Sequence, residues 1–211
     1  MALGHEASGI VEEVGPNVST VSKGDHVVLV FVPSCGHCTP CASGRPALCE
    51  PGAAANGAGT LLSGERRLSS GGHPVHHHLG VSAFAEYATV SERSVVKIDP
   101  EFDLTIAALF GCAVLTGVGA VVNTGHVPPG SKVAVIGLGG VGLCSLLGAK
   151  VSGASQIIAI DLNNDKLELA KELGATHTVN AGQEDAVAII RELSKGGVDF
   201  AFEMAGSVPA L

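Results

Sequence analysis

Three closely spaced glycines in the second half of the chain constrain its fold more than any other feature. Gly137, Gly139 and Gly142 follow the apolar run 132–136 and precede a second apolar segment at 142–151. A short run of β-branched residues is typical of a buried parallel strand, and a longer apolar run is typical of a helix. The glycines therefore lie in a tight turn from a strand into a helix, the context in which G-x-G-x-x-G favours dinucleotide binding.

Each glycine of this turn has its own physical role in holding a pyrophosphate. Gly137 permits the tight turn, Gly139 lets the backbone approach the phosphates, and Gly142 allows the helix to pack closely on the strand. Gly140 and Val141 lie just before the expected helix, whose N-terminus offers free N–H groups to an anion. All five residues are therefore candidates for binding the cofactor.

An acidic residue completes the dinucleotide pattern. Asp161 ends the next apolar run, 157–160, about 20 residues beyond the glycines, as the pattern requires. Its carboxylate can accept hydrogen bonds from the adenosine ribose and repels a 2′-phosphate, so the sequence favours NAD over NADP. A glycine-rich turn in some other α/β fold is the alternative interpretation.

Strand and helix patterns alternate from residue 132 to residue 204. Such alternation predicts an α/β fold with a doubly wound parallel sheet of the Rossmann type. Asn164 or Asp165 is expected to begin the middle helix, and Gly174 is expected to end it. The expected strands are 132–137, 156–161, 176–179 and 198–202, and the other expected helices are 142–151 and 186–195.

The first half of the chain has a different character. β-Branched and apolar runs at 10–11, 27–32 and 95–98 are separated by glycine-containing turns, which predicts a mostly β domain. Residues 52–80 are polar and rich in glycine, serine and histidine, and we expect a long loop there. Residues 104–122 are long and apolar enough for a buried helix. We therefore expect two domains, 1–103 and 104–211.

Four cysteines crowd into positions 35–49 and form a second strong motif. Cys35, Cys38, Cys41 and Cys49 offer four thiolates, which satisfy the tetrahedral preference of zinc. Four protein ligands leave no open coordination position, so the predicted zinc site is structural. Free buried thiols and an iron–sulfur cluster are the alternatives.

Charge and composition exclude several classes of protein. Lysine and arginine number 12 and aspartate and glutamate number 20, which gives a net charge of −8. This balance argues against nucleic acid as a partner, including for a zinc ribbon, and against docking on an anionic membrane. The chain opens without a basic start or long apolar run, so no secretory signal is expected and a cytoplasmic location is favoured.

One uncharged segment needs a membrane test. Residues 104–131 contain no acidic residue, lysine or arginine and are long enough to span a bilayer. However, the segment holds several glycines, His126 and the pair Pro128-Pro129. A buried helix followed by a turn is the favoured interpretation.

A third motif is split between distant parts of the chain. His5 and Glu6 lie near the start, and Cys112 lies far downstream. An isolated histidine or cysteine is most often a structural residue. Together, His5 and Cys112 could supply two ligands of an open zinc site, which needs three.

These motifs together resemble the zinc-dependent medium-chain alcohol dehydrogenase family. The resemblance covers essentially the whole chain and implies a GroES-like, mostly β catalytic domain followed by a Rossmann coenzyme domain, both partial. The segments that carry it are 4–9, 24–27, 35–49, 76–87, 111–117, 137–142, 161–166 and 196–200.

The resemblance implies roles for individual residues. It implies that His5 and Cys112 bind a catalytic zinc ion and that Glu6 lies beside that ion. It also implies that Thr116 packs on the nicotinamide and that Lys166 lies near the adenosine ribose. The implied cofactors are zinc and NAD.

The resemblance also implies the reaction and the partners. The reaction is hydride transfer between NAD and an alcohol or aldehyde, with zinc as the Lewis acid. The family's pattern starts upstream of His5 and continues past the last residue, so we expect a chain truncated at both ends. A full-length homo-oligomer is implied, and an inactive zinc- and nucleotide-binding fragment is the alternative function.

Overall fold

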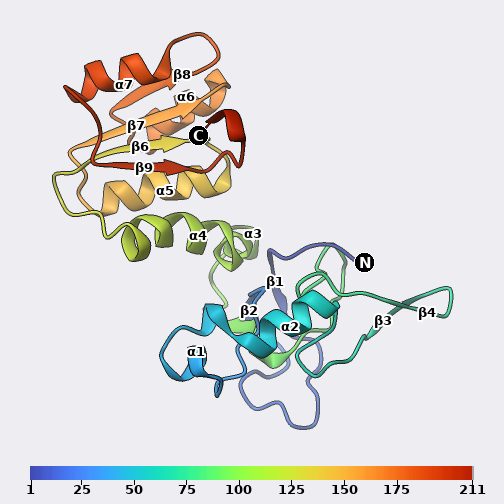
Figure 1. Cartoon of the computed structure of the whole chain (residues 1–211). Helices are drawn as coiled ribbons and strands as arrows, with labels where there is room; N and C mark the ends of the chain where they lie inside the picture. Colours follow the sequence, from blue (N-terminus) through green and yellow to red (C-terminus); the bar gives the residue numbers. More distant parts are fainter. Residues whose placement is uncertain (211) are drawn as a thin grey trace. The chain divides into compact units, whose positions relative to one another are not determined.

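The computed structural model describes residues 1–210, which divide into two compact units (Figure 1). The first unit is Met1–Cys112 and the second is Ala113–Leu211. Residues 104–112, which the sequence analysis assigned to the second domain, pack in the first. The hydroxyl of Ser8 donates to the carbonyl of Leu104, at 2.5 Å, and so ties this segment to the first strand.

The first unit contains a three-stranded antiparallel sheet, as expected for a mostly β domain. Its order is β1 (Ala7–Ile10), β2 (His26–Leu29) and β5 (Val95–Lys97). Gly9 pairs with Val27, and Val28 pairs with Val96. A small core forms on this sheet from Val21, Val27, Leu29 and Val81.

The prediction of a long loop at 52–80 is wrong. Helix α2 (Glu50–Ala58) covers the first part of this segment, and the hairpin of β3 (Leu68–Ser70) and β4 (His73–Val75) follows. Pro51 occupies the first turn, and Gly59 ends the helix with a left-handed conformation at φ 66°. Proline at the start and glycine at the end are ordinary helix signals that the polar composition obscured.

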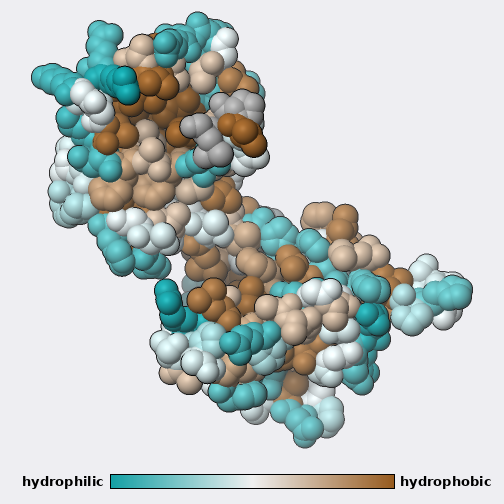
Figure 2. All heavy atoms as spheres, in the orientation of Figure 1, coloured by the Kyte–Doolittle hydropathy of each residue, from teal (hydrophilic) through white to brown (hydrophobic). Residues whose placement is uncertain are grey.

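The prediction of a single buried helix at 104–122 is also wrong. The structure has α3 (Leu104–Ala107) and a 3-10 helix (Ala108–Gly111), then α4 (Ala113–Gly119) and a π-helical stretch (Ala120–Thr124). Cys112 breaks the run with φ −148° and ψ −66°. Several apolar residues of the segment are exposed, among them Ile106 at 53% and Leu115 at 59%. Hydrophobic residues reach the surface in several places (Figure 2).

Among residues 1–210, no single helix has both the length and the apolar character needed to cross a bilayer. The two helical stretches Leu104–Gly111 and Ala113–Thr124 meet the criterion only when they are taken together across their break.

The second unit confirms the doubly wound parallel sheet. The strand order is β8-β7-β6-β9, the order expected for the first four strands of a Rossmann fold. All pairings are parallel. The strands are β6 (Lys132–Ile136), β7 (Gln156–Asp161), β8 (His177–Asn180) and β9 (Phe200–Glu203), and the helices between them are α5 (Gly140–Val151), α6 (Asn164–Leu173) and α7 (Ala186–Ser194).

Helices cover both faces of this sheet (Figure 1). Val133, Val135 and Ala159 face α5 and α6, where they pack on Leu146 and Leu167. On the other face Ala134, Ile158 and Val179 contact the apolar side of α7. Because both faces are buried, each central strand is an unbroken apolar run. The carboxyl ends of the strands remain as the place for functional side chains.

Candidate functional site

The four cysteines predicted to bind zinc converge in the first unit. They lie just before and within the short helix α1 (Thr39–Ala42) and at the N-cap of α2. One ligand atom from each of Cys35, Cys38, Cys41 and Cys49 lies within 4.8 Å of all the others, and all four cysteines are free thiols. The sulfurs of Cys38 and Cys49 are 3.9 Å apart. Four sulfurs around one zinc ion lie about 3.8 Å apart, from a Zn–S distance of about 2.3 Å, so the cluster fits tetrahedral zinc.

Backbone N–H groups point at these sulfurs. Cys35 N and Gly52 N donate to Cys49 Sγ at 3.2 and 3.4 Å, and Cys38 N donates to Cys35 Sγ at 3.3 Å. A hydrogen bond from the backbone of His37 lowers the pKa of Cys35 to about 6. Desolvation raises the pKa of Cys41 to about 12. Four thiolates gathered this closely need a cation to balance their charge.

His5 lies in the first unit before β1. Its ring makes edge-to-face contacts with Phe31 and with His78, each with 5.6 Å between ring centroids. Phe31 lies two residues after the last residue of β2, so the segment that follows β2 positions His5. His78 comes from segment 76–87, one of the segments that carry the family resemblance.

Cys112 follows a residue that packs on the same strand. A Cβ atom added to Gly111 would lie 2.4 Å from the carbonyl oxygen of Leu29, so only glycine allows this approach. The structure therefore places the two segments of the split motif near one strand end. Across residues 1–210, however, the cysteine cluster is the one group of three or more potential ligands that could hold a metal ion. His5 and Cys112 could therefore supply only two of the three protein ligands that an open zinc site needs.

The glycine turn lies between β6 and α5 in the second unit. Gly137 has φ 87°, a conformation that favours glycine, and a Cβ added there would lie 2.6 Å from Ala205 N. Gly139 and Gly140 are exposed, and no heavy atom lies within 4 Å of a Cβ built at Gly139. Among the residues described, no side chain caps the N-terminus of α5, where Val141 is the second residue. The turn therefore fits a pyrophosphate approaching its backbone.

Gly142 provides a stability test of this turn. A Cβ at Gly142 would lie 1.8 Å from the carbonyl oxygen of Gly137, which cannot move without distorting the turn. We expect Gly142→Ala to lower the free energy of unfolding of the second unit by about 3 kcal/mol. Gly139→Ala, which adds the same methyl group in open space, should cost about 1 kcal/mol or less. Denaturant unfolding of both variants measures the difference, and equal losses would contradict the assigned close packing.

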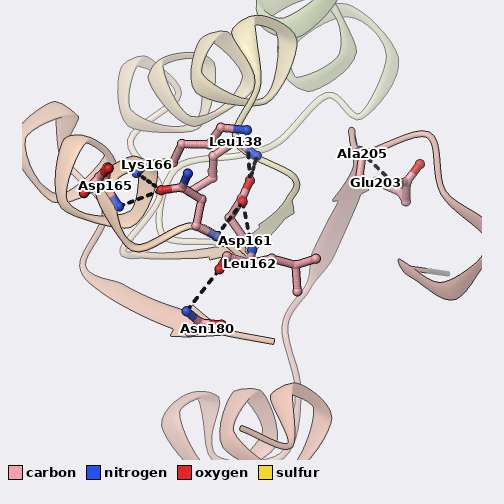
Figure 3. Close-up of polar contacts among 9 residues, drawn as sticks. Leu138, Asp161, Leu162, Asp165, Lys166, Asn180, Glu203 and Ala205 are labelled. Carbon is pink, nitrogen blue, oxygen red and sulfur yellow. Dashed lines mark hydrogen bonds and ion pairs between the residues drawn. The ribbon is translucent and has the colours of Figure 1, made fainter. Parts of the chain in front are cut away.

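Asp161 lies at the carboxyl end of β7, next to the glycine turn (Figure 3). Its Oδ2 accepts a hydrogen bond from Leu138 N at 2.7 Å, and its Oδ1 accepts from Leu162 N and Asn163 N at 2.8 and 3.0 Å. Lys166 Nζ lies 3.8 Å from Oδ2. The carboxylate thus fastens the glycine turn to the end of the neighbouring strand.

The surroundings of Asp161 keep it ionised. Desolvation by itself would raise the pKa of this carboxyl group. The backbone N–H groups that donate to it and the charge of Lys166 outweigh that effect, and together they lower the pKa below its ordinary value. Asp161 therefore carries a negative charge throughout the neutral range.

Thr116 and Lys166 are the two remaining residues that the resemblance places at the cofactor. Thr116 is exposed on α4, beside Gly117, which packs closely on α5. Lys166 lies in the first turn of α6, with its side chain 46% exposed. The structure thus brings Lys166 to Asp161 and places Thr116 on an accessible helix face.

The sequence analysis missed three polar residues around this site. Asn163, rather than Asn164 or Asp165, caps α6, because its side chain accepts from Asp165 N and Lys166 N. Asn180 is buried at the end of β8. Glu203, at the end of β9, accepts from Ala205 N at 2.7 Å (Figure 3). All three lie at or just after the carboxyl end of a parallel strand, and a search for polar residues at strand ends would have found them.

Two known domain families match the chain. Residues 1–100 match the GroES-like domain of alcohol dehydrogenases. Residues 140–211 match the zinc-binding dehydrogenase family. The two matches fall on the two compact units.

Solved structures match nearly the full length of the chain. An alcohol dehydrogenase zinc-binding domain protein from Burkholderia ambifaria is 43% identical, with a TM-score of 0.89, over 99% of this chain and 57% of its own. Benzyl alcohol dehydrogenase from Acinetobacter calcoaceticus is 44% identical, with a TM-score of 0.86, over 98% and 56%. The alcohol dehydrogenase from Aeropyrum pernix is 32% identical, with a TM-score of 0.76, over 99% and 58%. The chain thus spans little more than half the length of these relatives.

Proposed function

The chain belongs to the zinc-dependent alcohol dehydrogenase family, and on that premise we propose that it supplies the structural zinc lobe and the NAD-binding unit of such an enzyme. The proposed reaction is hydride transfer between NAD and an alcohol or aldehyde. The substrate class follows from the names of the relatives, among them a benzyl alcohol dehydrogenase. The working enzyme is proposed to be a homo-oligomer.

The observation that carries the nucleotide part of this proposal is the pairing of Asp161 with the glycine turn. The carboxylate holds Leu138 N at 2.7 Å, so the residue that would bind the ribose also orders the turn that would bind the pyrophosphate. Gly137, Gly139, Gly140, Val141 and Gly142 form that turn. An ionised carboxylate at this place favours NAD over NADP because it repels a 2′-phosphate. Lys166 is proposed to lie beside the ribose.

The proposed catalytic residues come from the split motif. We assign His5 and Cys112 as two ligands of the catalytic zinc, Glu6 as the acid beside it and Thr116 as a contact of the nicotinamide. Zinc in an open site polarises the oxygen of an alcohol or aldehyde. The contribution of these residues is to hold the ion and the nicotinamide in fixed positions, since orientation supplies much of the rate of hydride transfer.

Three measurements on the 211-residue chain test the proposal. Elemental analysis should find at least one zinc ion per chain, bound by Cys35, Cys38, Cys41 and Cys49. Calorimetric titration should detect NAD binding. Alcohol-dependent formation of NADH should follow if the catalytic site assembles. A chain that holds neither zinc nor NAD would contradict the proposal.

A second candidate function is a zinc- and nucleotide-binding chain that does not catalyse the reaction by itself. The observation in its favour is that the described residues contain one group of side chains that could hold a metal ion, the cysteine cluster. One zinc ion per chain with NAD binding but no NADH formation would support this candidate. Two zinc ions per chain and alcohol-dependent NADH formation would exclude it.

A further inference from the structure

Asn180 is a buried polar residue beside the proposed nucleotide site that the proposed function does not use. It is 7% exposed and lies at the carboxyl end of β8. In the parallel register of β7 and β8 its Cα pairs with that of Asp161. The two residues therefore occupy the same edge of the sheet on neighbouring strands.

The side chain of Asn180 is fully hydrogen-bonded, mainly to one turn. Nδ2 donates to the carbonyl of Leu162 at 3.2 Å and to Asn164 Oδ1 at 2.6 Å. Oδ1 accepts from Gly182 N at 2.9 Å. Both amide hydrogens are thus used on residues 162–164, the turn between β7 and α6. Figure 3 shows the bond to Leu162.

That turn fixes the groups expected to meet the ribose. Leu162 N and Asn163 N donate to Asp161 Oδ1, and the side chain of Asn163 caps the helix that carries Lys166. If the turn moved, both the carboxylate and the lysine would lose their positions. Leu162 itself is 71% exposed, so apolar packing contributes little to holding the turn. The buried amide of Asn180 is therefore the anchor of an otherwise exposed segment.

We propose that Asn180 is a positioning residue for the adenosine ribose, which it serves by holding the 162–164 turn without touching the nucleotide. This inference rests on the proposed NAD site. An aspartate at position 180 would keep the shape of the side chain but lose both N–H donors. It would also face two oxygen acceptors with a negative charge, which is more costly than losing the bonds alone.

The test compares Asn180→Asp with Gln183→Glu, which makes the same amide-to-carboxylate change at an exposed position three residues further along. Amide hydrogen exchange, followed by NMR, reports on the turn without any ligand. In Asn180→Asp the amides of Leu162 and Asn163 should exchange about tenfold faster or more, the effect of one lost buried hydrogen bond. The amides of β6 should keep their rates, and Gln183→Glu should match the unchanged chain. Unchanged exchange at Leu162 and Asn163 would overturn the inference.

Calorimetry with AMP, the adenosine half of NAD, gives the functional result. We expect Asn180→Asp to raise the Kd for AMP about tenfold at an unchanged binding stoichiometry, whereas simple unfolding lowers the stoichiometry. Asn164→Ala changes an exposed residue and removes one of the two hydrogen bonds that Asn180 donates to the turn. It should give a smaller rise in Kd, and it tests the inference even if Asn180→Asp folds poorly. An unchanged Kd in both variants would overturn the inference. If the unchanged chain binds neither AMP nor NAD, the proposed function fails instead.

Discussion

Replacing Cys41 with serine is expected to remove one zinc ion per chain. It is also expected to unfold much of the cysteine lobe, residues 35–49 of the first unit. A structural site with four thiolates has no spare ligand, and a serine hydroxyl stays protonated at neutral pH and binds zinc poorly. Zinc-binding free energy in such sites amounts to about 10–16 kcal/mol and is coupled to folding. The lobe has little else to stabilise it, since α1 contains four residues and buries none of them.

Elemental analysis and thermal unfolding measure this effect. Cys144→Ser is the matched control, because Cys144 lies on α5 in the second unit and outside the cluster. We expect the control to keep its zinc and the Cys41 variant to lose one ion and unfold at lower temperature. An unchanged zinc content in the Cys41 variant would contradict the assignment. Iron in place of zinc would support the iron–sulfur alternative.

The second unit was predicted well because local and tertiary signals agree there. Strand β7 was predicted with its observed bounds, 156–161, and Gly174 ends α6 as expected. Each central strand is buried on both faces, so an apolar run bounded by turns has one consistent interpretation. The one misplaced cap, Asn163, differs from the expected position by a single residue.

The first unit was predicted less well because its signals conflict. The segment around α2 is polar and rich in glycine, yet Pro51 and Gly59 define a helix within it. The apolar segment 104–122 has helical composition throughout, but Gly111 must approach the carbonyl of Leu29 and Cys112 breaks the helix there. Such a close approach depends on a distant strand, which no local pattern contains.

The residues of the candidate site likewise fall into those that the sequence predicts and those that only the fold brings together. The cysteine cluster and the glycine turn are local motifs, and the structure brings their members together as their spacing predicts. The contacts of His5 with Phe31 and His78, and of Asn180 with Leu162, join residues far apart in sequence. These tertiary neighbours became visible only with the fold.

Replacing Asp161 with serine is expected to reverse or abolish the preference for NAD over NADP. The ionised carboxylate repels a 2′-phosphate, and its removal frees Lys166, whose Nζ now lies 3.8 Å from Oδ2, to pair with that phosphate. A change of one charge at such a distance alters the ratio of the two affinities by about tenfold or more. Calorimetric Kd values for NAD and NADP give the ratio directly. NAD itself should bind more weakly, because ribose hydroxyls lose their acceptor.

Loss of the Asp161 carboxylate also removes hydrogen bonds that stabilise the second unit. Serine cannot accept from Leu138 N, Leu162 N and Asn163 N together, so the variant should also lose about 1–3 kcal/mol of stability. Asp165→Ser is the matched control: it removes a carboxylate from the first turn of α6 and should leave the ratio of the two affinities nearly unchanged. A ratio that stays fixed in Asp161→Ser would show that the ribose contact lies elsewhere. If the ratio shifts equally in Asp161→Ser and Asp165→Ser, the preference for NAD comes from the overall negative charge at this edge of the sheet. The carboxylate of Asp161, which orders the glycine turn, would then have no special role in it.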